Sequence, residues 1–323
     1  MSRRIRFVGT IVLTAAAVAY LAWKIDVSAT LDVLADTDLV WFALAVAIML
    51  VTVPALALRW QLLLRAHGIH ERLPWLTRSY LVGYAAGQVL PTTVGGDAVR
   101  VVETTRRHPG RAAAITGTVV LERGIGAAAT VLLGAIAFVL AIGRYDVSAY
   151  LWIEGAFALG TILVGFLFLA RSARPLLRFV EPLLRAARLD GPLRAFYESV
   201  HHYRGRTRLL LGIGVLMLAV QAVRILAIWA AGKAAGVDLS VLAYYVMGPL
   251  LFVVMLVPFT LNGIAVREAF FVSFMGSLGV AAEPAFAAGF LFFLVSLLMA
   301  LPGGAILAWE GVRGGPRPRV EHG

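Results

Sequence analysis

The sequence predicts an all-α membrane protein with six spanning helices, two re-entrant hairpins and an inverted-topology repeat. Apolar residues make up 60% of the 323 residues and charged residues only 15%, as in a multi-spanning membrane protein. A ten-residue motif occurs twice, as PTTVGGDAVR at Pro91–Arg100 and as PFTLNGIAVR at Pro258–Arg267. Each copy interrupts an apolar run with proline and glycine, a pattern typical of broken helices in the two halves of a transporter.

The two copies of the repeated motif share more than turn-forming residues. Besides proline, glycine and two apolar positions, they share a threonine (Thr93 and Thr260) and an arginine (Arg100 and Arg267). Two interhelical turns that were alike only by chance would not need the same polar residues. The pattern therefore favours a shared role for the two copies, with one copy in each half of the chain.

The net charge of +11 comes from 29 basic and 18 acidic residues, and the basic residues fall mainly in loops between apolar runs. The positive-inside rule explains this distribution, so we expect no nucleic-acid partner. The chain contains no cysteine, which excludes disulfides and thiolate chemistry. The histidines in polar loops have no carboxylate or cysteine companions, and no nucleotide-binding or hydrolase motif occurs, so we expect no metal, no cofactor and no ATP-driven pump.

The first spanning helix is predicted over 7–23, retained rather than cleaved as a signal peptide, with the N-terminus in the cytoplasm. An acidic external loop and a second helix over 39–64 follow. The next apolar run, 76–90, reaches only about 22 Å, short of the roughly 30 Å hydrocarbon core. If it crossed fully, the arginine-rich segments 100–111 and 171–208 would lie outside. A re-entrant hairpin that enters from the cytoplasm avoids this violation.

The remaining elements repeat this order with the opposite starting side, which defines units 1–145 and 146–310 of a single transmembrane domain (1–323). Three basic residues then face outside and four lie at membrane depth, which leaves 22 of the 29 in the cytoplasm. Both termini are predicted to be cytoplasmic, in a plasma-membrane protein. The predicted elements are helices at 112–142, 150–170, 209–231 and 285–309, an amphipathic surface segment at 174–203, a second hairpin at 242–257 and 269–278, and a tail at 311–323.

The two motif copies predict an anion-binding pocket near the middle of the membrane. Glycine amides, hydroxyl and amide side chains, and arginine forks suit a phosphate group. Charges at membrane depth are costly, which makes each a functional candidate. The candidate substrate-binding residues are Arg59, Thr92, Thr93, Gly95, Gly96, Asp97, Arg100, Glu122, Arg123, Arg224, Thr260, Asn262, Gly263, Arg267 and Glu268.

Several of these charges also have structural interpretations. Arg59 is close enough to a helix end to snorkel, and Arg224 could belong to a structural ion pair. Glu122 and Arg123 could form only a local pair. The acidic residues that follow the glycines, Asp97 and Glu268, could simply neutralise the neighbouring arginines. Gly83 and Gly87 are expected to serve helix packing alone.

At these residues the sequence resembles the lysylphosphatidylglycerol synthase transmembrane-region family, whose members are often described as flippase-like. The resemblance rests on Arg59-Trp60, Leu90–Arg100, Glu122-Arg123, Arg224, Val257–Phe270 and Pro302-Gly303-Gly304. Many members carry a second glycine where this chain has Ala265. In bifunctional members an aminoacyl-transferase domain follows, whereas here only a short tail follows Trp309, so synthase activity is not expected.

The leading hypothesis is a lipid transporter, not an enzyme, that moves an anionic or polyprenyl-type headgroup between leaflets by alternating access. We expect Arg100→Ala and Arg267→Ala to abolish this movement and leave the fold intact. The first alternative is a membrane glycosyltransferase that uses a polyprenyl-phosphate sugar, with Asp36 and Asp38 as a metal and sugar-phosphate site. The second is a structural partner of lipid-modifying enzymes.

Overall fold

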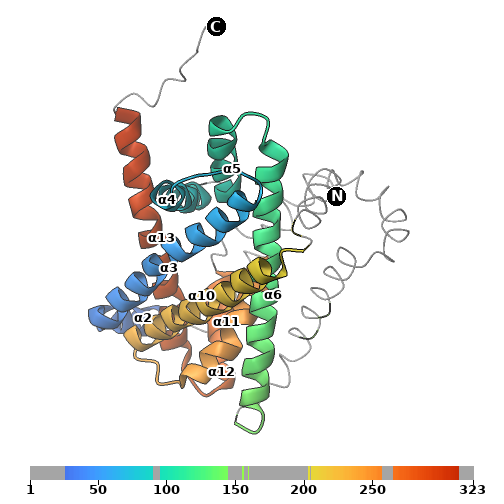
Figure 1. Ribbon diagram of the computed structural model, residues 1–323. Helices are drawn as coiled ribbons and strands as arrows, with labels where there is room; N and C mark the ends of the chain where they lie inside the picture. Colours follow the sequence, from blue (N-terminus) through green and yellow to red (C-terminus); the bar gives the residue numbers. More distant parts are fainter. Residues whose placement is uncertain are drawn as a thin grey trace, which may run out of the picture.

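A computed structural model describes residues 26–89, 95–144, 155, 159, 203, 205–256 and 265–312. This part of the chain is helical and contains no strand (Figure 1). The all-α prediction is confirmed there. The predicted helix 7–23, the predicted helix 150–170 apart from residues 155 and 159, the amphipathic segment 174–203 apart from Tyr203, and the tail beyond residue 312 lie outside it. The helices are α2 (Val27–Ala35), α3 (Leu39–Ala66), α4 (Leu73–Val89), α5 (Gly95–Arg107), α6 (Ala112–Ala141), α10 (Thr207–Ala234), α11 (Val241–Leu256), α12 (Val266–Ser277) and α13 (Ala282–Val312).

Four described helices, α3, α6, α10 and α13, are long and apolar enough to cross a membrane. Their outward faces expose large aliphatic side chains, including Val51 (72% exposed) on α3 and Leu211 (69%) on α10. Contiguous apolar surface of this kind is normal where lipid is the surrounding solvent. The described part of the chain therefore has the character of a multi-pass membrane protein.

The acidic segment before α3 was predicted to be a loop, and this is wrong for its first part. Residues 27–35 form α2 because Asp26 caps it: the Asp26 carboxylate accepts hydrogen bonds from the backbone N–H groups of Ser28 (2.8 Å) and Ala29 (3.1 Å). Asp38 caps α3 in the same way, accepting from Val40 N at 2.8 Å. Two of the aspartates are therefore N-caps that define where helices begin.

The long helices pack in opposite directions. The Asp38 N–H at the start of α3 donates to the Ala234 carbonyl at the end of α10, over 3.0 Å. At the other end, the Tyr203 hydroxyl donates to the Leu63 carbonyl over 2.7 Å. Figure 1 shows the antiparallel α3 and α10 side by side, and α6 and α13 also run in opposite directions.

Both copies of the repeated motif lie next to the ends of described helices. α4 ends at Val89 and α5 begins at Gly95, while α11 ends at Leu256 and α12 begins at Val266. Glycine allows α4 and α5 to approach closely, because a Cβ at Gly83 would lie 3.0 Å from the Gly96 carbonyl oxygen and a Cβ at Gly96 would collide with the Gly83 carbonyl. The predicted packing role of Gly83 is confirmed.

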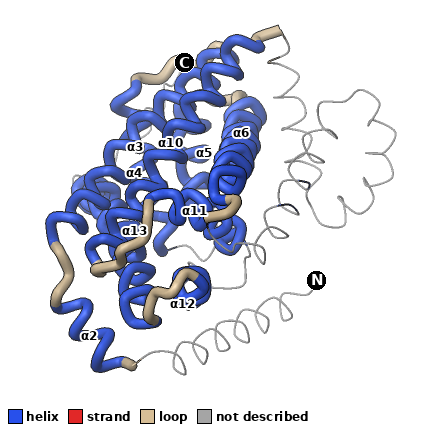
Figure 2. Tube along the Cα trace, turned by 90° about the horizontal axis from the view of Figure 1, so that it is seen from below, coloured by secondary structure: helices blue, strands red, loops and turns tan. Residues whose placement is uncertain are grey.

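The helix contacts of the two halves correspond. α3 packs on α4, α6 and α13, and α10 packs on α11, α13 and α6. Likewise, α4 contacts α5 and α13, and α11 in the second half contacts α12 and α6. In the same way, α5 contacts α6, and α12 contacts α13. Exchanging α3, α4, α5 and α6 for α10, α11, α12 and α13 reproduces the same set of contacts. Figure 2 shows α3 and α10 beside each other when the bundle is seen from below.

Candidate functional site

A buried carboxylate joins two arginines from different helices. Glu122 on α6 is 1% exposed, and its two oxygens accept from two different guanidinium groups. Arg59 Nε on α3 donates to Oε1 over 3.0 Å, and Arg100 Nη2 on α5 donates to Oε2 over 2.7 Å. A buried carboxylate shared by two arginines in this way is held by charge-assisted hydrogen bonds on both sides.

A tyrosine hydroxyl completes the bridge. Tyr80 Oη on α4 accepts from Arg59 Nη2 and from Arg100 Nη1, each over 3.1 Å, and donates to Glu122 Oε1 over 2.8 Å. One donor and two acceptor positions are all a hydroxyl offers, so Tyr80 is fully used. The Arg100 guanidinium also lies over the rings of Tyr80 (4.4 Å) and Trp60 (4.5 Å).

The second carboxylate of this region lies nearer the surface. Asp97 Oδ1 accepts from Arg100 Nε over 3.0 Å, and Oδ2 accepts from Arg123 Nε over 2.6 Å. The Arg123 side chain is 46% exposed, whereas that of Arg100 is 4% exposed. We call the set Arg59, Tyr80, Asp97, Arg100, Glu122 and Arg123 the polar cluster.

The polar cluster decides between several sequence-based alternatives. Arg59 is buried within the protein against Glu122, so it does not snorkel. Asp97 does neutralise Arg100, as the structural interpretation expected. Glu122 bridges Arg59 and Arg100 rather than serving only its sequence neighbour. Because protein groups already occupy Arg100 on its edges and its faces, the polar cluster is a stabilising network across four helices.

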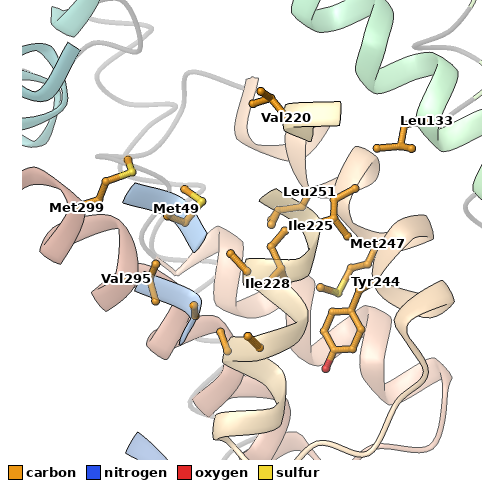
Figure 3. Packing of buried hydrophobic residues seen from close by; sticks show 14 of the residues in the cluster. Met49, Leu133, Val220, Ile225, Ile228, Tyr244, Met247, Leu251, Val295 and Met299 are labelled. Atoms are coloured by element: carbon orange, nitrogen blue, oxygen red, sulfur yellow. The ribbon is translucent and has the colours of Figure 1, made fainter. Parts of the chain in front are cut away.

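A cavity of about 350 Å³ lies elsewhere in the bundle. Its walls come from all seven of α3, α4, α6, α10, α11, α12 and α13. Most lining side chains are apolar, and Figure 3 labels several of them within the buried hydrophobic core, among them Met49 of α3, Ile225 of α10, Leu251 of α11 and Met299 of α13. The polar lining residues are Tyr84, Gln88, Thr130, Gln221, Arg224, Arg267 and Ser296.

Two arginines line this cavity with few protein partners. Arg267 on α12 is 4% exposed and donates to Glu268 Oε1 from Nη2 (2.6 Å) and Nε (3.0 Å), and its guanidinium lies 4.9 Å from the centre of the Phe293 ring. Among the described residues, none forms a hydrogen bond or ion pair with Arg224, and none pairs with Glu268 Oε2. No carboxylate is among the described residues that line the cavity.

The structure divides the predicted site residues into three sets. Gly95, Gly96 and five charged residues lie in or beside the polar cluster, and Arg224 and Arg267 line the cavity, with Glu268 paired behind Arg267. Arg100 and Arg267 were expected in one shared pocket, but Arg100 does not line this cavity. The predicted residues that fall outside the described part of the chain are Thr92, Thr93, Thr260, Asn262 and Gly263.

Sequence reasoning missed the uncharged polar residues that lie outside the repeated motif. Tyr80 lies in an apolar run and is indistinguishable there from a core aromatic, while Gln88 and Gln221 are single amides in such runs. Gln221 donates to the Thr130 hydroxyl over 2.6 Å at the cavity wall. An amide within an apolar helix is a usable signal, because a polar group at membrane depth needs a partner.

Comparisons with known proteins agree with the fold and the motifs. The family described as lysylphosphatidylglycerol synthase TM region matches residues 7–304. A protein of Haloferax volcanii named glycosyltransferase AglD is 28% identical over 344 residues, which cover 94% of this chain and 54% of that relative. The chain thus spans about half the length of this relative.

Proposed function

The chain belongs to the lysylphosphatidylglycerol synthase transmembrane-region family, and we propose that it moves the headgroup of an anionic or polyprenyl-type phospholipid between membrane leaflets. The observation that carries this proposal is the cavity, in which two arginines face mainly apolar walls. Pockets that bind small ligands have this character: a mostly apolar lining with a few polar groups that fix orientation. A headgroup phosphate joined to an apolar chain is the complementary ligand.

The arrangement of the helices supports alternating access as the mechanism. The contacts of α3–α6 correspond to those of α10–α13, and the central helices α3 and α10 run in opposite directions. This is the arrangement expected of two inverted repeats, whose relative rocking exposes one site to each side in turn. In this proposal α4–α5 and α11–α12 are the two re-entrant hairpins, and the cavity lies where both repeats contribute walls.

A leaflet-exchange assay tests the proposal directly. The full chain is reconstituted into vesicles that contain phosphatidylglycerol labelled on its headgroup, and a membrane-impermeant quencher reads the outer leaflet. Wild-type protein is expected to expose label from both leaflets, and Arg224→Gln is expected to slow this exchange about tenfold or more, because a charged hydrogen-bond donor to the headgroup is lost.

The matched control is Arg208→Gln, which removes an exposed arginine of the same helix, α10. It should exchange lipid as fast as wild type. Exchange no faster than in protein-free vesicles, for phosphatidylglycerol and for a polyprenyl-phosphate probe alike, would contradict the proposal.

A second candidate function is sugar transfer from a polyprenyl-phosphate sugar, which the name of the Haloferax volcanii relative favours. The sequence-based site for this activity was Asp36 and Asp38. Asp38 uses its carboxylate to cap α3, and the described residues contain no group of three or more histidine, cysteine or acidic side chains placed to hold a metal ion. Sugar transfer by the purified chain that disappears in Asp36→Asn would establish this function over transport.

A further inference from the structure

The two halves each carry a pair of arginines at corresponding places. Arg59 on α3 precedes Arg100 by 41 residues, and Arg224 on α10 precedes Arg267 by 43. Arg100 and Arg267 are the last residues of the two copies of the repeated motif. α10 occupies in the second half the place that α3 occupies in the first, and Arg224 lies two residues before the position that the 167-residue offset of the motif assigns to Arg59. Arg224 and Arg267 are therefore compared with Arg59 and Arg100.

The acidic partner occurs in one half only. Glu122 follows Arg100 by 22 residues and lies between the two arginines of the first half. The residue that follows Arg267 by 22 is Gly289 on α13. A Cβ there would lie 3.2 Å from Phe271 Cγ and 3.4 Å from Glu268 Cα, so even the first atom of a side chain would be tightly packed at this position.

We infer that Arg224 and Arg267 together bind the phosphate of a lipid phosphate ester, which takes the role that the Glu122 carboxylate has between Arg59 and Arg100. This inference rests on the proposed function for the lipid nature of the ligand. A phosphate presents several acceptor oxygens to guanidinium forks, as a carboxylate does. Arg267 Nη1 donates to no described residue, and Arg224 has all of its donors available.

The charge and size of the cavity narrow the ligand class. Two arginines and Glu268 give a formal charge of +1, which matches the single negative charge of a phosphodiester. The volume of about 350 Å³ lies at the lower end of the range for small-molecule pockets, which suits a headgroup rather than a whole lipid. Among the other lining residues, Gln221 can bond the polar remainder, and Phe292 can contact its apolar end.

The test is lipid binding to the full chain in detergent micelles, measured by native mass spectrometry while phosphatidylglycerol is titrated. Arg224→Gln is expected to weaken binding about tenfold to a hundredfold, because one charge-assisted partner of the phosphate is lost. Gln221→Glu, which puts a carboxylate on the cavity wall three residues before Arg224, should weaken binding similarly. Arg208→Gln should bind as wild type does. Unchanged binding in Arg224→Gln would overturn the inference.

Arg267→Gln needs a second variant, because it leaves the buried Glu268 without its partner and destabilises the protein for that reason alone. The double variant Arg267→Gln/Glu268→Gln removes both charges and should fold, with a thermal midpoint near that of wild type, yet bind phosphatidylglycerol at least tenfold more weakly. Wild-type affinity in this folded double variant would contradict a role for Arg267.

Competition distinguishes the two sources of phosphate. Inorganic phosphate and glycerol phosphate should displace the lipid only at concentrations far above its dissociation constant, because they lack the apolar contacts. Displacement at comparable concentrations would show a site for free anions and overturn the lipid assignment. Arginine-dependent binding without lipid exchange in vesicles would refute the proposed transport but support this phosphate site. Lipid exchange that is insensitive to Arg224→Gln would refute the phosphate site but support the proposed transport.

Discussion

The first half of the chain surrounds its deep arginines with protein groups, whereas the second half leaves its corresponding arginines beside a cavity. Arg100 contacts two carboxylates, a hydroxyl and two aromatic rings. Arg267 has one carboxylate and one aromatic ring, and Arg224 has no ion pair within the described ranges. The same residue type at corresponding positions therefore has two different energetic roles.

The difference teaches that a charge at membrane depth is informative only together with its partners. A buried ion pair is strongly destabilised when one partner is removed, since the other charge is left uncompensated. An arginine without a protein partner contributes little to folding and is available to a ligand. We therefore expect substitutions in the polar cluster to change stability, and substitutions at the cavity arginines to change binding.

The largest expected effect is at Glu122. Glu122→Gln removes the charge shared by Arg59 and Arg100 and should lower the free energy of unfolding by about 3 to 5 kcal/mol. Arg224→Gln in the second half should lower it by less than about 1 kcal/mol, because no described ion pair is broken. Thermal unfolding in detergent micelles measures both variants. Equal destabilisation by the two would remove the distinction between the halves.

The sequence-based expectation for Arg100 changes for the same reason. Arg100→Ala was expected to abolish lipid movement with the fold intact. The structure shows that Arg100 is 3% exposed and bound to Glu122 and Asp97, so its removal leaves two carboxylates undercompensated. Loss of activity in this variant would therefore report unfolding as much as function, and Arg224 is the better probe of the site.

The second expected effect is at Tyr80. Tyr80→Phe keeps the ring under Arg100 but removes the hydroxyl that serves two arginines and Glu122, and should cost about 2 to 3 kcal/mol. By the offset of the repeated motif, the corresponding residue in the second half is Met247, which is 1% exposed. Met247→Leu conserves volume and should cost less than about 1.5 kcal/mol. The same unfolding measurement compares them, and the reverse order would show that this hydroxyl is dispensable.

The long helices and their interruptions could be predicted from the sequence. Helices expected over 39–64 and 209–231 are observed as α3 (Leu39–Ala66) and α10 (Thr207–Ala234), because length and apolar composition determine them. Within the described part of the chain, α5 begins inside the first copy of the motif, at Gly95, and α12 begins at Val266 of the second copy. α2 was missed because its N-cap, Asp26, belongs to a run of aspartates that also fits an external loop.

The sequence predicted which residues belong to the candidate site, but not that they fall into separate groups. Charge at membrane depth selected Arg59 and Glu122, the repeated motif selected Asp97 and Arg100, and the structure brings these four residues together. Whether an arginine is saturated or free depends on residues far away in the sequence, since Arg59 and Glu122 are 63 positions apart. Composition and spacing do not reveal which residues so far apart in the sequence become neighbours in the fold. The sequence-based prediction therefore placed all the arginines in one pocket.

The third expected effect tests the close approach of α4 and α5. A methyl group at Gly96 would collide with the Gly83 carbonyl, so Gly96→Ala should separate the two helices and cost about 1 to 3 kcal/mol. Gly212 on α10 is exposed and has open space around its Cβ position, so Gly212→Ala should instead stabilise the protein by up to about 1 kcal/mol through helix propensity. Unfolding curves that shift in the same direction would contradict the proposed contact.

The smallest expected effect separates the two motif copies themselves. Ala98 lies within α5 and is exposed, whereas the corresponding Ala265 precedes α12 with φ +67° and ψ −38°, a conformation that a side chain disfavours. Glycine tolerates this conformation because it has no Cβ. Ala265→Gly should therefore stabilise the protein by about 1 kcal/mol, while Ala98→Gly should destabilise it by about 0.5 to 1 kcal/mol. Opposite shifts of the unfolding midpoint are the expected result, because one substitution relieves backbone strain and the other only adds freedom to the unfolded chain. Destabilisation by both would mean that the backbone at Ala265 is not strained, and that the two copies begin their helices alike.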